Sequence, residues 1–410
     1  MNKKIAIILP GKLPVPAIKG GAIESTIELL VNENEKKKQL DIYVFSSYDK
    51  EAGQLSTKYN NTKFVWIKRG ILYKLVDFFI RVFRKLFNFK IDRLDSQIIK
   101  RQVRKREFDK VVIHGSTTHL SALSNVVPKN NLIFYVHANI FSIPSKINQN
   151  LGQIAGIYVA VSNFIKAEVE KNAFVPASRI KVIKNPIDLN NYTKHVPSTE
   201  IKARLKTKFN INEQDIVILF AGRIVENKGI KELILALKSL PNDTNFKLLI
   251  VGSFGSGFGS GESIDDFAKQ LKNIANDLEE KVLFTGFVHN SYLPRIHSIT
   301  DILVMPSLCE ESAGKAAMEA MAGGIPVITT IAGGIPEYVS EDAGILLERD
   351  RDLISNLANA LKILIDNKTL REAMGTKGRE LAKEFAPSRF YRDYVNLILN
   401  DRQLERQDLI

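Results

Sequence analysis

The sequence contains one cysteine, Cys309, among its 410 residues. No intrachain disulfide and no cysteine-based zinc site can therefore form, which suits a reducing compartment. The sequence also lacks any run of ~20 consecutive apolar residues, the length that a membrane-spanning helix needs. The short apolar run near the start ends at Pro10-Gly11 without a small-residue cleavage site, so it predicts a buried strand rather than a secretion signal. We expect a cytoplasmic protein.

Composition excludes further classes of protein. Hydrophobic residues make up 45% and charged residues 25% of the chain, which is typical of a globular protein and not of a disordered or collagen-like one. At roughly 150 residues per domain, this length predicts two or three domains. Lysine and arginine outnumber the acidic residues and give a formal net charge of +13. That surplus favours an anionic partner: nucleic acid, anionic lipid or a phosphorylated small molecule.

The positive charge is concentrated in residues 71–106. Over 71–87, leucine, valine and phenylalanine recur at helical spacing, with lysine and arginine on the other sides, and a second basic cluster follows at 100–106. A basic helix with a Phe- and Leu-rich face is typical of helices that lie in a membrane interface, and it predicts contact with an anionic membrane surface. The alternative is an amphipathic helix packed on the core. No nucleic-acid-binding signature accompanies the charge, so we expect no nucleic-acid partner.

Strand-like apolar runs alternate with helical stretches, which predicts an α/β protein with parallel sheets covered by helices on both faces. We expect a first domain over 1–188, a second over 189–386, and a last helix over 387–410 that packs back towards the first. Ligands bind at the carboxyl ends of the strands in such sheets, so a cleft between the domains is the expected site. The expected strands are Lys4–Leu9, Leu40–Ser46, Val111–His114, Leu132–His137, Gly156–Ser162, Lys181–Ile183, Ile216–Phe220, Phe246–Gly252, Val282–Gly286, Ile302–Pro306, Pro326–Thr330 and Gly344–Leu347.

Two cations lie five positions apart in the loop between the strand ending at Phe220 and a helix that starts near Gly229. They are Arg223 and Lys228. A guanidinium fork and a compact ammonium at one strand end suit two phosphates and the charge on a departing diphosphate. Without other signals, the alternative is two solvated loop cations.

A second motif follows the strand that ends at Pro306. A short turn leads into an Ala- and Met-rich helix near Gly314, whose first backbone N–H groups can accept an anion. Glu311 precedes this helix and Glu319 lies within it, and a carboxylate accepts hydrogen bonds from the vicinal hydroxyls of a sugar or ribose. The alternative is that both are ordinary helix-start and surface carboxylates.

A third and weaker motif is Gly20-Gly21, after the first strand and before a helix. Two glycines let the backbone approach a ligand closely. The pair does not form the G-x-G-x-x-G dinucleotide fingerprint.

In their order along the chain, these motifs resemble the retaining glycosyltransferases of family four. The resemblance also includes Val161-Ser162, the turn 185–188 and the segment 284–287, and it is strongest for a spore-coat and exopolysaccharide branch. It implies the GT-B architecture: two Rossmann-like, doubly wound parallel-sheet domains with an inter-domain cleft. It also implies sugar transfer from a nucleoside-diphosphate-sugar donor with retention of configuration, without a cofactor and without an essential metal.

The resemblance implies roles for particular residues. Arg223 and Lys228 would bind the donor diphosphate, Glu311 the donor-sugar hydroxyls and Glu319 the ribose hydroxyls, while His137 would lie near the reacting sugar. The remaining donor contacts would come from the backbone of Gly20 and Gly21, from Ala313, Gly314, Lys315 and Ala316, and from Phe287 and Val288 beside the base. Positioning and stabilisation of the leaving diphosphate would then drive the reaction.

Three positions depart from the family pattern. Ser312-Ala313-Gly314 stands where family members usually have Gly-Phe-Gly, and Lys315 replaces an aliphatic residue.

We expect a glycan acceptor, lipid-linked, as in capsule or exopolysaccharide assembly at the inner face of the cell membrane. Two other hypotheses stay open: a different GT-B enzyme, such as a phosphorylase or sugar-nucleotide epimerase, and a non-catalytic partner subunit. His114, which also ends a strand, can face the acceptor or be structural.

Overall fold

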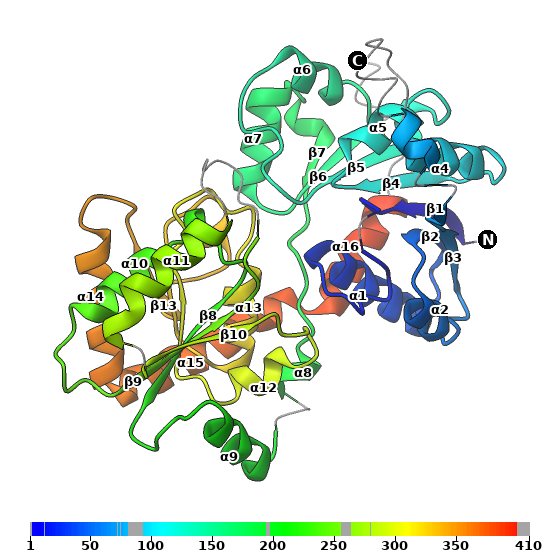
Figure 1. Cartoon of the computed structure of the whole chain (residues 1–410). Coiled ribbons are helices and arrows are strands. Elements are labelled where there is room, and N and C mark those ends of the chain that lie inside the picture. Colours follow the sequence, from blue (N-terminus) through cyan, green and yellow to red (C-terminus); the bar gives the residue numbers. More distant parts are fainter. Residues whose placement is uncertain are drawn as a thin grey trace. The chain divides into compact units, whose positions relative to one another are not determined.

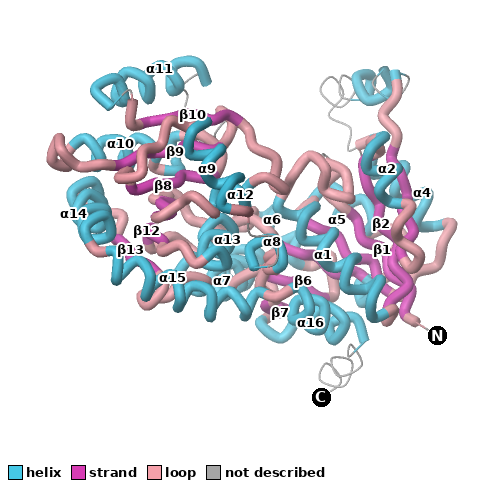
Figure 2. The backbone as a smooth tube through the Cα atoms, turned by 90° about the horizontal axis from the view of Figure 1, so that it is seen from below, coloured by secondary structure: helices cyan, strands magenta, loops and turns pink. Residues whose placement is uncertain are grey.

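The chain folds into two units, shown in the computed structural model of Figure 1. The structure describes residues 2–11, 13–71, 73, 75–80, 93–193, 197–255, 264–278 and 280–399. Unit 1 consists of residues 1–186 together with 387–410, and unit 2 of residues 187–386. In each unit, helices flank the strands of a parallel sheet (Figure 2).

Unit 1 is built on a seven-stranded parallel sheet with the order β3-β2-β1-β4-β5-β6-β7. Its first strand is central, and the residues Ile5–Ile8 are fully buried because helices cover both faces. Its strands are β1 (Lys3–Ile8), β2 (Leu40–Ser47), β3 (Thr62–Ile67), β4 (Lys110–His114), β5 (Leu132–Val136), β6 (Ile157–Ala160) and β7 (Ile180–Val182).

Strand β3 is absent from the sequence prediction. It is an edge strand that pairs only with β2, from Ile42 opposite Thr62 to Ser47 opposite Ile67. Lys63 is exposed and the next three residues are partly buried. An edge strand with this much exposure lacks the continuous apolar run that marks the central strands.

The last helix, α16 (Pro387–Leu399), belongs to unit 1 although the chain reaches it only after all of unit 2. It packs against α1 (Ala22–Lys37), where the Tyr391 hydroxyl donates a hydrogen bond to Oδ1 of Asn34 at 2.7 Å. The other helices of unit 1 with described bounds are α2 (Lys50–Ser56), α4 (Leu94–Arg104), α5 (Thr117–Leu123), α6 (Lys146–Gly152) and α7 (Asn163–Ala173).

Unit 2 is built on a six-stranded parallel sheet with the order β10-β9-β8-β11-β12-β13. Its strands are β8 (Ile216–Ala221), β9 (Phe246–Val251), β10 (Val282–Gly286), β11 (Ile302–Met305), β12 (Val327–Thr330) and β13 (Gly344–Leu347). Its helices are α8 (Asn190–Thr193), α9 (Thr199–Lys208), α10 (Ile230–Lys238), α11 (Ile264–Ala275), α12 (Leu293–His297), α13 (Lys315–Gly323), α14 (Leu353–Asp366) and α15 (Lys368–Ala382).

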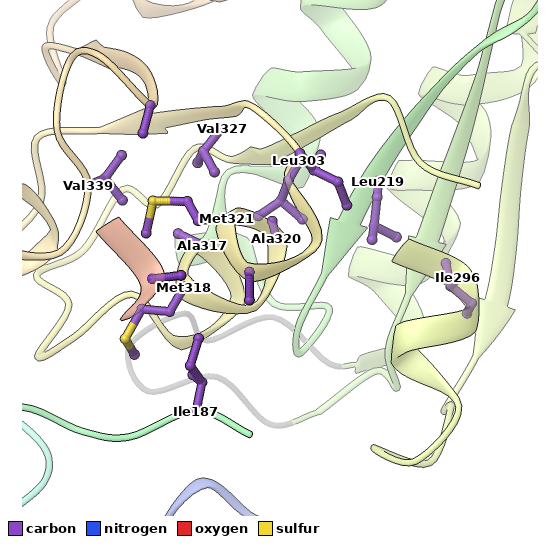
Figure 3. Close-up of a cluster of buried hydrophobic side chains, with 14 of the residues drawn as sticks. Ile187, Leu219, Ile296, Leu303, Ala317, Met318, Ala320, Met321, Val327 and Val339 are labelled. Carbon is purple, nitrogen blue, oxygen red and sulfur yellow. The ribbon is translucent and has the colours of Figure 1, made fainter. Parts of the chain in front are cut away.

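Successive residues of the unit 2 strands are apolar. Because successive side chains of a strand point to opposite faces, both faces of the sheet are apolar. In β8, Val217 and Leu219 enter one core with α13, whereas Ile218 and Phe220 enter the other with α10, α11 and α14. Figure 3 shows the first core, in which Ala317, Met318 and Met321 of α13 pack beside strand residues such as Leu219 and Val327. The small and flexible side chains of α13 let it lie close to the strand ends.

The segment predicted to contact a membrane is described only in part. Residues 72, 74 and 81–92 lie outside the described residues. Of the described ones, 75–80 are helical, and Ile71, Phe78 and Phe79 are 81%, 61% and 60% exposed. Further along, α4 buries Ile99 and Val103 and exposes Arg101 and Arg104. Among the described helices, none has both the length and the apolar character needed to cross a bilayer.

Candidate active site

The loop after β8 carries the two predicted phosphate-binding cations of unit 2. It runs from Gly222 to Gly229, which precedes α10 with a φ of 71°. A Cβ atom at Gly229 would lie 1.9 Å from the carbonyl oxygen of Pro306, so only glycine allows this approach. The loop therefore packs directly against the segment that follows β11.

This packing brings Lys228 to Glu311. The Lys228 ammonium forms an ion pair with Oε1 of Glu311, and the Ser307 hydroxyl donates a hydrogen bond to the same oxygen at 2.6 Å. The side chains of Lys228 and Glu311 are only 20% and 16% exposed, and Ser307 is fully buried. Charge-assisted hydrogen bonds at such partly buried positions are stronger than neutral ones. Glu311 is thus held in one orientation by the protein itself.

Backbone hydrogen bonds fix the segment that carries Glu311. The amide of Leu308 donates to the Asn227 carbonyl at 2.9 Å, which ties the segment to the loop of Lys228. The amide of Gly334 donates to the carbonyl of Glu311 at 2.7 Å, and the Thr330 hydroxyl donates to the Ser307 carbonyl at 2.6 Å. The ends of three adjacent strands, β8, β11 and β12, are therefore connected at this site.

The start of α13 holds a second pair of opposite charges. Gly314 precedes the helix and has no side chain that could cap it, so the backbone N–H groups of the first turn have no partner from the N-cap position. Lys315 and Glu319 lie one turn apart, with Nζ and Oε1 separated by 3.8 Å. Burial raises the pKa of Glu319, and Lys315 opposes that rise. Burial, together with the negative charge of Glu319, raises the pKa of Tyr192 on α8.

The other predicted donor-binding residues of unit 2 differ in their exposure. Arg223 is exposed, and it forms no ion pair within the described part of the chain. Phe287 is 62% exposed, whereas its neighbour Val288 packs against the core that contains α13. Ala313 and Ala316 are partly buried against the same core.

The predicted residues of unit 1 lie in segments that follow its strands β1 and β5. Gly20 and Gly21 have φ angles of 74° and 96°, and Gly21 is the residue before α1. His137 follows β5 directly, and its Nε2 lies 2.8 Å from Nδ1 of His114, the last residue of β4. The predicted site residues thus form two sets, one in each unit.

Sequence reasoning did not single out Ser307 or Tyr192. The only signal for Ser307 is its place at a strand end, four positions before Glu311, and nothing local indicates Tyr192. Within the described residues, no group of three or more His, Cys, Asp or Glu side chains could hold a metal ion.

Family models match both units. Residues 39–191 match the model described as Glycosyltransferase Family 4, and residues 201–381 match Glycosyl transferases group 1. The chain belongs to the family-4 glycosyltransferases. Spore coat protein SA of Bacillus subtilis is 26% identical to this glycosyltransferase, over 93% of the chain and 94% of the relative. The lipopolysaccharide 1,2-N-acetylglucosaminetransferase of Salmonella typhimurium is 29% identical, over 64% of the chain and 66% of the relative.

The solved structures support the same fold. Anabaena HepE, in complex with UDP and glucose, matches with a TM-score of 0.74 and 19% identity, over 97% of this chain and 99% of HepE. The glycosyltransferase therefore has the predicted GT-B fold of two Rossmann-like units, with parallel sheets of seven and six strands.

Proposed function

We propose that this glycosyltransferase moves a sugar, with retention of configuration, from a nucleoside-diphosphate-sugar donor to a lipid-linked glycan in cell-surface polysaccharide synthesis. The observation that carries the proposal is the ion pair of Lys228 and Glu311, held by Ser307 where the strands of unit 2 end. It joins one group suited to a phosphate and one suited to sugar hydroxyls. The complex of HepE with UDP and glucose, and the lipopolysaccharide transferase among the relatives, support this substrate class.

In this reaction the chain's own residues position the donor and stabilise the charge that develops on the leaving diphosphate. Lys228, Arg223 and the backbone N–H groups at the start of α13 would stabilise that charge. Glu311 would orient the donor sugar, Glu319 would bind the ribose, and His137 would lie beside the reacting sugar. Donor binding would move Lys228 from Glu311 to a phosphate and free the carboxylate for hydroxyl groups. The proposal includes no essential metal ion, so we expect EDTA to leave the rate unchanged.

Hydrolysis of a panel of nucleotide sugars, followed by product analysis, tests the proposal because hydrolysis needs no acceptor. We expect one donor to be hydrolysed preferentially and its anomeric configuration to be retained in the product. Use of free phosphate as the sugar acceptor, or interconversion of the donor sugar, would instead identify a phosphorylase or an epimerase. Binding without turnover on any acceptor would identify a non-catalytic subunit.

We also propose that unit 1 binds an anionic membrane surface on the cytoplasmic side through residues 71–106. The exposed rings of Phe78 and Phe79, and the exposed Arg101 and Arg104 of α4, support this assignment. Apolar side chains insert at the acyl boundary, and each cation near the surface adds ~1 kcal/mol.

Co-sedimentation with vesicles that contain phosphatidylglycerol tests the membrane contact. We expect the double substitution Phe78→Ser and Phe79→Ser to reduce binding at least tenfold. The control is Ile363→Ser in unit 2, which removes an apolar side chain of α14 that is 51% exposed and should leave binding unchanged. Equal binding by both variants would contradict the assignment.

A further inference from the structure

Four aromatic rings gather at the carboxyl ends of β4 and β5 in unit 1. Tyr135 stacks against two histidines, with ring centroids 4.8 Å from His114 and 4.6 Å from His137, and both pairs of planes are within 15° of parallel; the two histidine centroids are 5.1 Å apart. Tyr394 of α16 lies nearly parallel to this group, 6.4 Å from His114. His114 and Tyr394 are fully buried, whereas His137 is partly exposed.

The two histidines are joined by a hydrogen bond. Nδ1 of His114 and Nε2 of His137 are 2.8 Å apart, a usual distance for such a bond. Burial lowers the pKa of His137 to about 3, and burial and the neighbouring His137 lower that of His114 well below its ordinary value. Both rings are thus neutral near pH 7, and each carries one N–H.

The direction of this bond decides where both protons lie. If His137 donates from Nε2, the proton of His114 must be on its own Nε2, which is buried and has no partner among the described residues. If His114 donates from Nδ1, its Nε2 is a bare lone pair, and the other N–H is Nδ1–H of the partly exposed His137, which is not among the buried atoms without a partner. Because orphaned buried N–H groups are rarer than unsatisfied acceptors, the second direction is favoured.

We propose that His114 is a positioning residue that donates its Nδ1–H to Nε2 of His137 and thereby holds His137 as the Nδ1–H tautomer. The inference rests on the proposed function, in which His137 lies beside the reacting sugar. Nδ1 of His137 forms no hydrogen bond with the described residues, so its N–H is available to an oxygen of the substrate. In this arrangement His137 donates a hydrogen bond and cannot accept a proton through Nε2.

Long-range proton–nitrogen NMR of the full chain, labelled with nitrogen-15 histidine, tests the tautomer directly and does not depend on activity. We expect His137 to be protonated on Nδ1 and His114 on Nδ1 as well. Signals that show His137 protonated on Nε2 would overturn the proposal, whatever the role of His137 in transfer.

Two substitutions test the consequence for the reaction. His114→Phe keeps an aromatic ring in the stack but removes the donor, whereas His114→Asn places an amide N–H close to the position of Nδ1. With UDP-glucose, or the donor that the panel selects, we expect His114→Phe to lower kcat about tenfold with little change in KM. His114→Asn should stay within about threefold of the parent protein, and its NMR spectrum should still show the Nδ1–H form of His137.

Tyr394→Phe is the matched control, because it removes a buried hydroxyl that has no hydrogen-bond partner among the described residues and keeps the ring. It should change neither kcat nor the tautomer. A folded His114→Phe protein with the parent kcat would overturn the role of His114. Full activity of His137→Ala would instead remove His137 from the proposed function, while the NMR experiment would still decide the direction of the bond.

Discussion

The two units of this glycosyltransferase share a strand order but have different chemistry at their strand ends. In unit 2 the segments after β8 and β11 meet as a charged pair, Lys228 with Glu311. In unit 1 the ends of β4 and β5 meet as a neutral pair, His114 with His137, inside a stack of rings. The same strand arrangement can therefore carry either charged or neutral hydrogen-bonding groups at its carboxyl ends, because the site depends on the residues that follow the strands.

The two pairs also differ in how burial affects them. The charged pair remains partly exposed and each member compensates the other, so an anionic ligand can exchange with the carboxylate without leaving a buried charge unpaired. In the histidine pair His114 is fully buried, and burial lowers the pKa of both rings and keeps them neutral. In the proposed function, the charged pair of unit 2 would meet the diphosphate and the neutral pair of unit 1 would meet uncharged hydroxyls.

The largest expected effect comes from breaking the charged pair. We expect Lys228→Ala and Glu311→Gln each to lower kcat/KM at least 100-fold, the loss typical of removing one group that stabilises developing charge. Lys238→Ala is the matched control, since Lys238 also pairs with a carboxylate of unit 2, Asp277, at 2.6 Å on the surface. Steady-state donor hydrolysis gives the comparison. Near-parent activity in both site variants would show that the pair has no role in transfer.

A smaller effect is expected from the serine that orients Glu311. Ser307→Ala removes the 2.6 Å hydrogen bond but leaves the ion pair with Lys228, so we expect kcat/KM to fall about tenfold, equivalent to about 1.4 kcal/mol. Ser355→Ala, on the exposed start of α14, should have no effect. If Ser307→Ala were as active as this control, the ion pair alone would suffice to orient Glu311.

Acidic pH should lower the unfolding stability of unit 1 more than that of unit 2. Burial lowers the pKa of three histidines of unit 1, His114, His119 and His137, and of one described histidine of unit 2, His297. Unfolded histidine takes up a proton near pH 6.5. Native His119, His137 and His297 have pKa values of about 4, 3 and 4, and the pKa of His114 is also well below its ordinary value, so unfolding becomes easier as the pH falls below 6.5. The raised pKa of Glu319 acts in the opposite sense in unit 2, because its native carboxyl gains a proton first.

Urea unfolding at pH 7 and pH 5 measures this difference. The only tryptophan, Trp66, lies on β3 and reports unit 1, while hydrogen exchange of the β8 amides reports unit 2. Between pH 7 and pH 5, we expect the unfolding stability of unit 1, reported by Trp66, to fall more than that of unit 2, reported by the β8 amides. A larger fall in unit 2 would mean that the buried histidines do not dominate the acid response.

The smallest expected effect concerns α16, the last helix, which packs on unit 1. Tyr391→Phe removes the hydrogen bond from α16 to Asn34, while Asn34 keeps its bonds to the backbone of Leu40. We expect the free energy of unfolding, followed through Trp66, to fall by about 1 kcal/mol, with the hydrogen exchange of the β8 amides unchanged. A change below the error of the measurement would indicate that packing of α16 on α1 suffices.

Much of the fold was predictable because buried parallel strands are continuous apolar runs between helical stretches. The apolar runs of β5, β8 and β11 identify buried strands, and the carboxyl ends of these strands identify where His137, Lys228 and Glu311 must lie. Edge strand β3 was missed because its residues are partly exposed. The hydrogen bond of Ser307 was missed because a serine after a strand has no local signal that distinguishes it.

By itself, the sequence determined the α/β class, the alternation of strands and helices, and the residue types at each strand end, because these depend on neighbours within a few positions. Only the tertiary structure decided which of these residues meet. Lys228 and Glu311 are 83 positions apart, His114 and His137 are 23 apart, and Tyr391 and Asn34 are 357 apart. Such contacts depend on strand order and helix packing, which no local pattern encodes.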